Sequence, residues 1–146
     1  MENANSTINN KKKLKLDFKE SKYATGRRKR SIAKVWIKKG SGNIHVNGLK
    51  MNEYFKRPVH QIIVTRPLEI SEVATNYDVK CSVKGGGLSG QAGAIILGIS
   101  KALIAHDENL KKSLKKDKLT TRDSRVVERK KYGHRKARRS FQFSKR

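Results

Sequence analysis

One stretch in the middle of the chain restricts the possible fold more than any other. Apolar and polar residues alternate strictly from Tyr77 to Lys84, which predicts a strand with one buried face. Three glycines follow, and the run from residue 88 to residue 104 is apolar on nearly every side, which predicts a buried helix. Gly93 and Gly98 lie inside this run, and each costs about 1 kcal/mol of helix propensity relative to alanine. Glycine at these positions is reasonable if the helix packs very close to a sheet.

Two further alternating runs predict a β-hairpin earlier in the chain. Residues 33–38 and 44–46 each alternate apolar with polar side chains, and the segment 39–42 between them contains two glycines. A short connection of this kind commonly joins neighbouring antiparallel strands, so the two runs are expected to pair with each other. The basic residues 27–30 precede the first of these strands directly.

Two short helices are expected between the hairpin and the strand at residues 77–84. Apolar residues within 49–55 predict the first helix, which should end near Arg57 because Pro58 disfavours helical backbone in the residue before it. Apolar residues within 59–63 predict the second, which is expected to stop before Pro67. With the two hairpin strands and the longer buried helix, these segments indicate a small sheet accompanied by helices.

The chain is expected to divide into three parts. Residues 1–21 are polar without a sustained period and predict a mobile tail. Residues 22–120 hold the material for one globular core, and residues 121–146 form a basic tail. The last eighteen residues contain nine Lys or Arg and no Asp or Glu. From Arg129 onward there is too little apolar surface to offset the entropy of ordering the chain.

The charge of the chain calls for an anionic partner. Thirty-six Lys and Arg residues stand against twelve acidic residues, which gives a formal net charge of +24. A dense polyanion neutralises such a charge better than water and salt do. The single cysteine, Cys81, lies on the apolar side of its strand and is interpreted as a small buried hydrophobic residue, which fits a reducing compartment. The longest apolar run, residues 94–99, is too short to cross a membrane, so no membrane partner is expected.

A nucleotide-dependent enzyme is the alternative to consider, because a strand, a glycine-rich turn and a helix can cradle phosphate. The turn lacks the Gly-Lys-Ser/Thr of a phosphate-binding loop, and its glycine spacing does not fit a dinucleotide fingerprint. The four histidines are scattered, and the acidic pair Asp107-Glu108 is better explained as the cap and first turn of a helix. The sequence therefore predicts no catalytic residues, no metal site, no cofactor and no small-molecule substrate.

The basic tail carries aromatic residues between its cations. Tyr132, Phe141 and Phe143 could stack on unpaired bases while the cations follow phosphates. They could instead enter an apolar pocket of another protein. A general nucleic-acid-binding or DNA-compacting protein with no preference for ribosomal RNA is also open at this point.

Three blocks of the sequence resemble one protein family. They read YATGRRKRSIAKVW from Tyr23, KGGGLSGQAGAIILGISKAL from Lys84, and TRDSRVVERKKYGHRKARRSFQFSKR from Thr121. Together they are similar to the universal small-subunit ribosomal protein number nine in its bacterial and organellar form. The resemblance covers about residues 22–146, and its middle block and its ending are highly specific.

The resemblance implies a fold and a location. The fold would be α+β: a small, mainly antiparallel sheet with helices packed on one face and a left-handed crossover, similar to the second domain of small-subunit ribosomal protein five, followed by a long extended basic tail. The protein would lie in the head of the small ribosomal subunit, in the bacterial cytoplasm or the matrix of an organelle such as the mitochondrion. Its partners would be small-subunit ribosomal RNA, the peptidyl-site (P-site) tRNA and neighbouring head proteins.

The resemblance also implies roles for individual residues. The tip of the tail would approach the anticodon stem-loop of the P-site tRNA through Ser144, Lys145 and Arg146. The expected contacts with ribosomal RNA come from the basic cluster before the first strand, the glycine-rich turn and the cations of the tail: Arg27, Arg28, Lys29, Arg30, Gly85, Gly86, Gly87, Arg122, Arg125, Arg129, Lys130, Lys131, Arg135, Lys136, Arg138 and Arg139.

Overall fold

The computed structural model describes residues 19–145. The N-terminal segment that was expected to be mobile lies largely outside the described residues, as does Arg146. The strands are β1 (Lys22–Arg28), β2 (Ser31–Lys39), β3 (Ile44–Val46), β4 (Leu49–Lys50) and β5 (Tyr77–Lys84). The helices are α1 (Met51–Tyr54), α2 (Pro58–Ile70), α3 (Leu88–His106) and α4 (Leu110–Lys116).

The five strands form one sheet in the order β1-β2-β5-β3-β4. Neighbouring strands are antiparallel except β3 and β5, which run parallel. The prediction of an α+β fold with a mainly antiparallel sheet is therefore confirmed. The predicted strand at residues 77–84 and the predicted helix after it correspond to β5 and α3.

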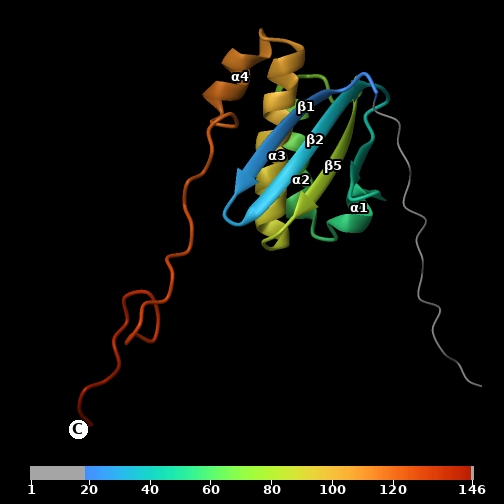
Figure 1. Cartoon of the computed structure of the whole chain (residues 1–146). Helices are drawn as coiled ribbons and strands as arrows, with labels where there is room; N and C mark the ends of the chain where they lie inside the picture. The colour runs from blue at the N-terminus through green and yellow to red at the C-terminus, as the bar shows by residue number, and fades with distance from the viewer. Residues whose placement is uncertain (1–18, 146) are drawn as a thin grey trace, which may run out of the picture.

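The core lies between the sheet and the helices on one of its faces (Figure 1). Alternate residues of β2, from Ser31 to Ile37, are fully buried, and those of β5, from Tyr77 to Val83, are almost so. Eleven of the nineteen residues of α3 are buried against them. The helix α3 is long and apolar enough to resemble a membrane span, but this burial gives it the role of a core helix in the domain.

Glycine allows α3 to approach the sheet backbone to backbone. A Cβ atom on Gly26 of β1 would lie 2.5 Å from the backbone nitrogen of Gly98, and still closer to the carbonyl oxygen of Ala94. A Cβ on Gly98 itself would lie 2.5 Å from Cγ2 of Val35. Real Cβ atoms essentially never approach other atoms so closely, so larger residues would push the helix off the sheet. The expectation drawn from the helix glycines, that the helix packs very close to a sheet, is confirmed.

The predicted hairpin of residues 33–38 with 44–46 is wrong, because β5 lies between β2 and β3. The connection between the two strands passes over the end of β5 and is fixed there by Asp78. Its carboxylate accepts hydrogen bonds from the backbone N–H groups of Ser41 (3.0 Å) and Asn43 (2.8 Å). Burial raises the pKa of this carboxyl, but these hydrogen bonds outweigh burial and leave the pKa lowered. A glycine-containing connection alone could not reveal this pairing, because its partner lies more than thirty residues further along the chain.

The prediction that the second short helix stops before Pro67 is also wrong, because α2 runs from Pro58 to Ile70. Pro67 is buried against the core, and its carbonyl oxygen accepts a hydrogen bond from the N–H of Ser71 (3.3 Å). Packing of the ring therefore outweighs the helix hydrogen bond that proline cannot make. The face of α2 also differs from expectation, since Val59 and Ile62 are exposed while His60 is buried.

Two smaller expectations need correction. Residues 22–28 form β1, so Arg27 and Arg28 lie within a strand instead of before one. Asp107 does not cap a helix directly, because α4 begins at Leu110 and Asn109 stands at its N-cap position. The Asp107 carboxylate instead accepts a hydrogen bond from the N–H of Asn109 (3.0 Å) in the turn before that helix.

Candidate nucleic-acid interface

The glycine-rich turn and the β1–β2 turn meet at the start of α3. Gly85 and Gly86 have positive φ angles, and the hydroxyl of Ser31 donates a hydrogen bond to the carbonyl oxygen of Gly85 (3.1 Å). A Cβ on Gly86 would collide with the same hydroxyl. Gly87 stands at the N-cap position of α3 and has no side chain with which to cap it. The first N–H groups of the helix and its positive dipole end therefore face this turn.

A cleft of about 680 Å³ opens at this point. Three cations line it, namely Lys29 and Arg30 from the β1–β2 turn and Arg57 from the start of α2. Together with the end of α3 they can hold an anion such as a phosphate group. The remaining lining residues are Ser31, His60, Gly86, Gly87, Leu88, Ser89, Gly90, Val126 and Val127. The structure thus brings together predicted residues that are more than fifty positions apart in the sequence. Sequence reasoning missed Arg57, although a cation before a helix-starting proline was a signal to weigh.

The side chain of Arg28 does not line this cleft but lies across the face of the sheet that the helices cover. Its side chain crosses over Gly93 of α3, where a Cβ would lie 2.7 Å from Nη1. It then reaches Asp123 at the root of the tail, with Nη2 3.5 Å from Oδ2. Its Nε is buried and has no hydrogen-bond partner among residues 19–145. Arg28 therefore joins β1, α3 and the tail within the protein.

Asp123 also binds Arg125, which donates hydrogen bonds from Nε (3.0 Å to Oδ1) and Nη2 (2.9 Å to Oδ2). The backbone N–H of Arg125 donates to Asp123 Oδ1 as well (3.1 Å). The hydrogen bonds from Arg125, and then the charge of Arg28, hold the pKa of Asp123 well below its usual range. Two arginines expected to contact RNA thus share one carboxylate here. We call Arg28, Asp123 and Arg125 the tail clasp.

Beyond the clasp, the chain leaves the globular part without helix or strand up to residue 145, apart from one bridge between His134 and Ser140 (Figure 1). That bridge closes a loop in which the guanidinium of Arg135 lies 5.5 Å from the ring centre of Phe141. Glu128 pairs with Lys131 (3.6 Å) and Arg138 (3.0 Å).

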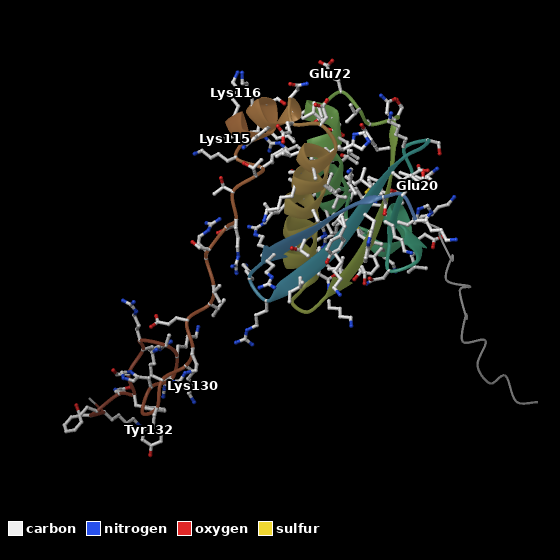
Figure 2. The ribbon with its side chains drawn as sticks, turned by 45° about the horizontal axis from the view of Figure 1, so that its top comes forward. Glu20, Glu72, Lys115, Lys116, Lys130 and Tyr132 are labelled. Atoms are coloured by element: carbon white, nitrogen blue, oxygen red, sulfur yellow. The ribbon has the colours of Figure 1, made fainter. Side chains whose placement is uncertain are left out.

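Other predicted residues of the tail lie on its surface. Tyr132 is fully exposed and projects away from the loop, as Figure 2 shows. Phe143 is fully exposed too. The tail cations up to residue 145 are exposed as well, and the side chain of Arg138 is 87% exposed even while it pairs with Glu128. These cations are Arg122, Arg125, Arg129, Lys130, Lys131, Arg135, Lys136, Arg138, Arg139 and Lys145. These groups can reach a partner without any rearrangement of the globular part.

Among residues 19–145 there is no group of three or more His, Cys, Asp or Glu side chains placed to hold a metal ion. Cys81 is buried, and burial strongly raises the pKa of its thiol.

A comparison with known protein families identifies a family that matches most of the chain. The family described as ribosomal protein S9/S16 matches residues 26–146, which is most of the chain. The match includes the glycine-rich turn, α3, the tail clasp and the entire basic tail, and it confirms the resemblance noted in the sequence. The chain therefore belongs to the ribosomal protein S9/S16 family, whose members are structural proteins of the small ribosomal subunit.

Proposed function

We propose that this protein docks on small-subunit ribosomal RNA in the head of the subunit through the cleft at the start of α3, and that its basic tail follows the RNA toward the P-site tRNA. The observation that carries the proposal is that three cations meet the uncapped end of α3 in one cleft. The tail residues Val126 and Val127 line the same cleft. Phosphates held in the cleft would therefore lead directly to the tail.

The cleft suits a polymer better than a free nucleotide. A phosphate-binding loop for nucleotides carries a lysine within the loop itself, whereas the cations here come from two other segments, β1–β2 and α2. Charges spread over a rim can follow successive phosphates along a strand. The glycines of the turn then serve close approach of the backbone to RNA, in addition to packing against Ser31.

The length of the tail supports contact at a distance. Eighteen residues reach at most about 60 Å when fully extended at roughly 3.3 Å each, and the loop closed between His134 and Ser140 shortens this reach, whereas a 100-residue domain has a radius of gyration of roughly 13 Å. A body anchored on ribosomal RNA can therefore place Ser144, Lys145 and Arg146 far from itself. The left-handed crossover, the contacts with neighbouring head proteins and a bacterial or organellar host remain predictions from the family.

The salt dependence of binding tests the proposal. Each phosphate neutralised on single-stranded RNA contributes about −0.7 to the log–log slope of affinity against salt, so six contacts in the tail would give about −4. Removal of residues 129–146, which carry nine cations, should flatten the slope by that amount. Removal of residues 1–18 is the control of equal length, since this segment has four lysines and two acids and so a net charge of only +2.

Three results would contradict this function. An unchanged slope after removal of residues 129–146 would place the electrostatic contact elsewhere on the chain. Equal affinity for ribosomal RNA and for DNA of the same length would indicate general nucleic-acid binding. Nucleotide hydrolysis that is lost in Gly86→Val would indicate an enzyme, whereas the proposal expects this variant to hinder assembly into the small subunit.

A further inference from the structure

The face of the sheet opposite the helices is not covered by any element of the described chain. Register places two rings together on this face, because Tyr23 of β1 pairs directly with Trp36 of β2. Their centroids are 5.3 Å apart with the rings tilted by 42°, and Tyr23 is 48% exposed. Figure 1 shows the helices on the other side of the strands. Trp36 is partly exposed and Tyr23 about half exposed, so this aromatic pair can be reached by a partner on the open sheet.

Cations surround this aromatic pair. Lys80 of β5 lies with Nζ 5.9 Å from the centre of the Trp36 ring. The open face carries further basic side chains from the strands, as the alternation of the buried positions requires: Arg27, Lys34, Lys38, Lys50 and Lys84. Within the five strands the only acidic residue is Asp78, and its carboxylate is engaged by the connection between β2 and β3. The charge of this face is therefore almost entirely positive.

We propose that this open face binds unpaired RNA bases, which stack on Trp36 and Tyr23 while the surrounding lysines and Arg27 contact the phosphates. Stacking requires bases that are not held in a duplex. A single strand presents free bases and phosphates, and an aromatic pair surrounded by cations can bind both, the bases by stacking and the phosphates by charge. An apolar protein partner would leave the cations buried without countercharge, which is costly. The proposal rests on the proposed function in taking RNA as the partner, but it assigns a second surface that uses neither the cleft nor the tail.

Trp36 is the only tryptophan of the chain and therefore reports on its own site. The full-length protein is titrated with a single-stranded RNA of about ten nucleotides, and with a duplex of the same length. We expect the single strand to quench the fluorescence of Trp36, and the duplex to quench it much less at equal occupancy. Occupancy is followed separately by the anisotropy of a labelled RNA.

Substitutions distinguish stacking from charge. Trp36→Leu should weaken binding of the single strand about tenfold, the effect typical of one lost stacking contact, whereas Trp36→Phe should retain most of the affinity. Ile62→Ala, which removes an exposed side chain of α2 outside the cleft, the tail and the open face, is the control and should leave both the affinity and the quenching of Trp36 unchanged. Circular dichroism of each variant checks that the sheet is intact.

The test separates this proposal from the proposed function. Removal of residues 129–146 should weaken binding to ribosomal RNA, but the single strand should still quench the fluorescence of Trp36. Equal quenching by single strand and duplex, or a Trp36→Leu affinity within twofold of the wild type, would overturn the stacking proposal whatever the tail does. Quenching that occurs only after removal of residues 1–18 would also overturn it, since that segment would then be the occupant of the face.

Discussion

The close approach of β1 to α3 leads to a sharp prediction for Gly26→Ala. The new Cβ would lie 2.5 Å from the backbone nitrogen of Gly98, about 0.9 Å short of ordinary contact at 3.4 Å, and nearer still to the carbonyl oxygen of Ala94. Both obstacles are backbone atoms of a helix that is buried against the sheet, so neither can rotate away. Overpacking costs about 1–3 kcal/mol where side chains can adjust, and we expect about 3 kcal/mol or more here.

Gly87→Ala is the matched control, because a Cβ at this position would meet nothing within 4 Å and the φ angle of −107° suits alanine. Both variants remove one glycine from the unfolded chain, so that this contribution cancels between them. The free energy of unfolding is measured with urea, using the fluorescence of Trp36, and by thermal denaturation. For a domain of about 100 residues, 3 kcal/mol corresponds to a decrease in Tm of roughly 12 °C or more. A neutral surface change alters the free energy of unfolding by about 0.5 kcal/mol or less. If the unfolding free energies of Gly26→Ala and Gly87→Ala differed by no more than about this value, the packing argument would be refuted.

Four further predictions follow from other contacts. Gly93→Ala should displace the side chain of Arg28 and release the tail clasp, which proteolysis near residue 123 should detect as faster cleavage; an unchanged cleavage rate would contradict the clasp. Cys81 should resist alkylation at about pH 8 in the folded protein and react after unfolding, because burial raises the pKa of its thiol; rapid reaction in the folded state would contradict its burial. Because the pKa of Asp78 is lowered in the folded protein, its carboxylate stabilises the fold at neutral pH, and this stabilisation is lost as the pH falls below 3.8 and through the pKa of the folded state. Asp78→Asn should therefore make the free energy of unfolding less sensitive to acid. An identical pH profile of the two proteins would contradict this role of Asp78. Deletion of residues 144–146 removes two of 36 cations, so the affinity for ribosomal RNA should stay nearly unchanged. Dissociation of P-site tRNA from the small subunit should become faster by a factor that corresponds to about 1 kcal/mol or less. Equal dissociation rates would contradict a contact with tRNA and leave the tail as an anchor on ribosomal RNA.

The elements with strong local patterns could be predicted from the sequence. The strand at residues 77–84 alternates without exception, and the glycines within 88–104 indicated a helix packed close to the sheet. Strand pairing could not be predicted in the same way, because the partner of β2 is chosen by contacts far along the chain. Asp78 illustrates this, since it looked like an ordinary polar residue of a strand yet it fixes the connection that separates β2 from β3.

The candidate site was predictable in composition but not in orientation. The four consecutive basic residues before Ser31 could be identified from the sequence, but β1 could not. The alternation of their side chains between the two faces of the sheet was therefore missed. Arg27 lies on the open face of the sheet, Arg28 turns toward α3, and Lys29 and Arg30 reach the cleft. The open face was overlooked for a related reason. Trp36 sits at a polar position of an alternating strand, and only the register with β1 brings Tyr23 beside it.

The position of β5 in the middle of the sheet has a consequence for the order of events during synthesis. The β1–β2 hairpin is complete once residue 39 has left the ribosome, but β3 and β4 have no place in the sheet until β5 arrives with residues 77–84. The ladder between β2 and β5 joins residues as far apart as Ile32 and Lys84, and such distant pairing is slow because a long loop must close first. The helix α3 can cover the core only afterwards. The newly made chain therefore passes through an interval in which the apolar side of the hairpin is open, and the basic tail emerges last, when the surface from which it departs has already formed.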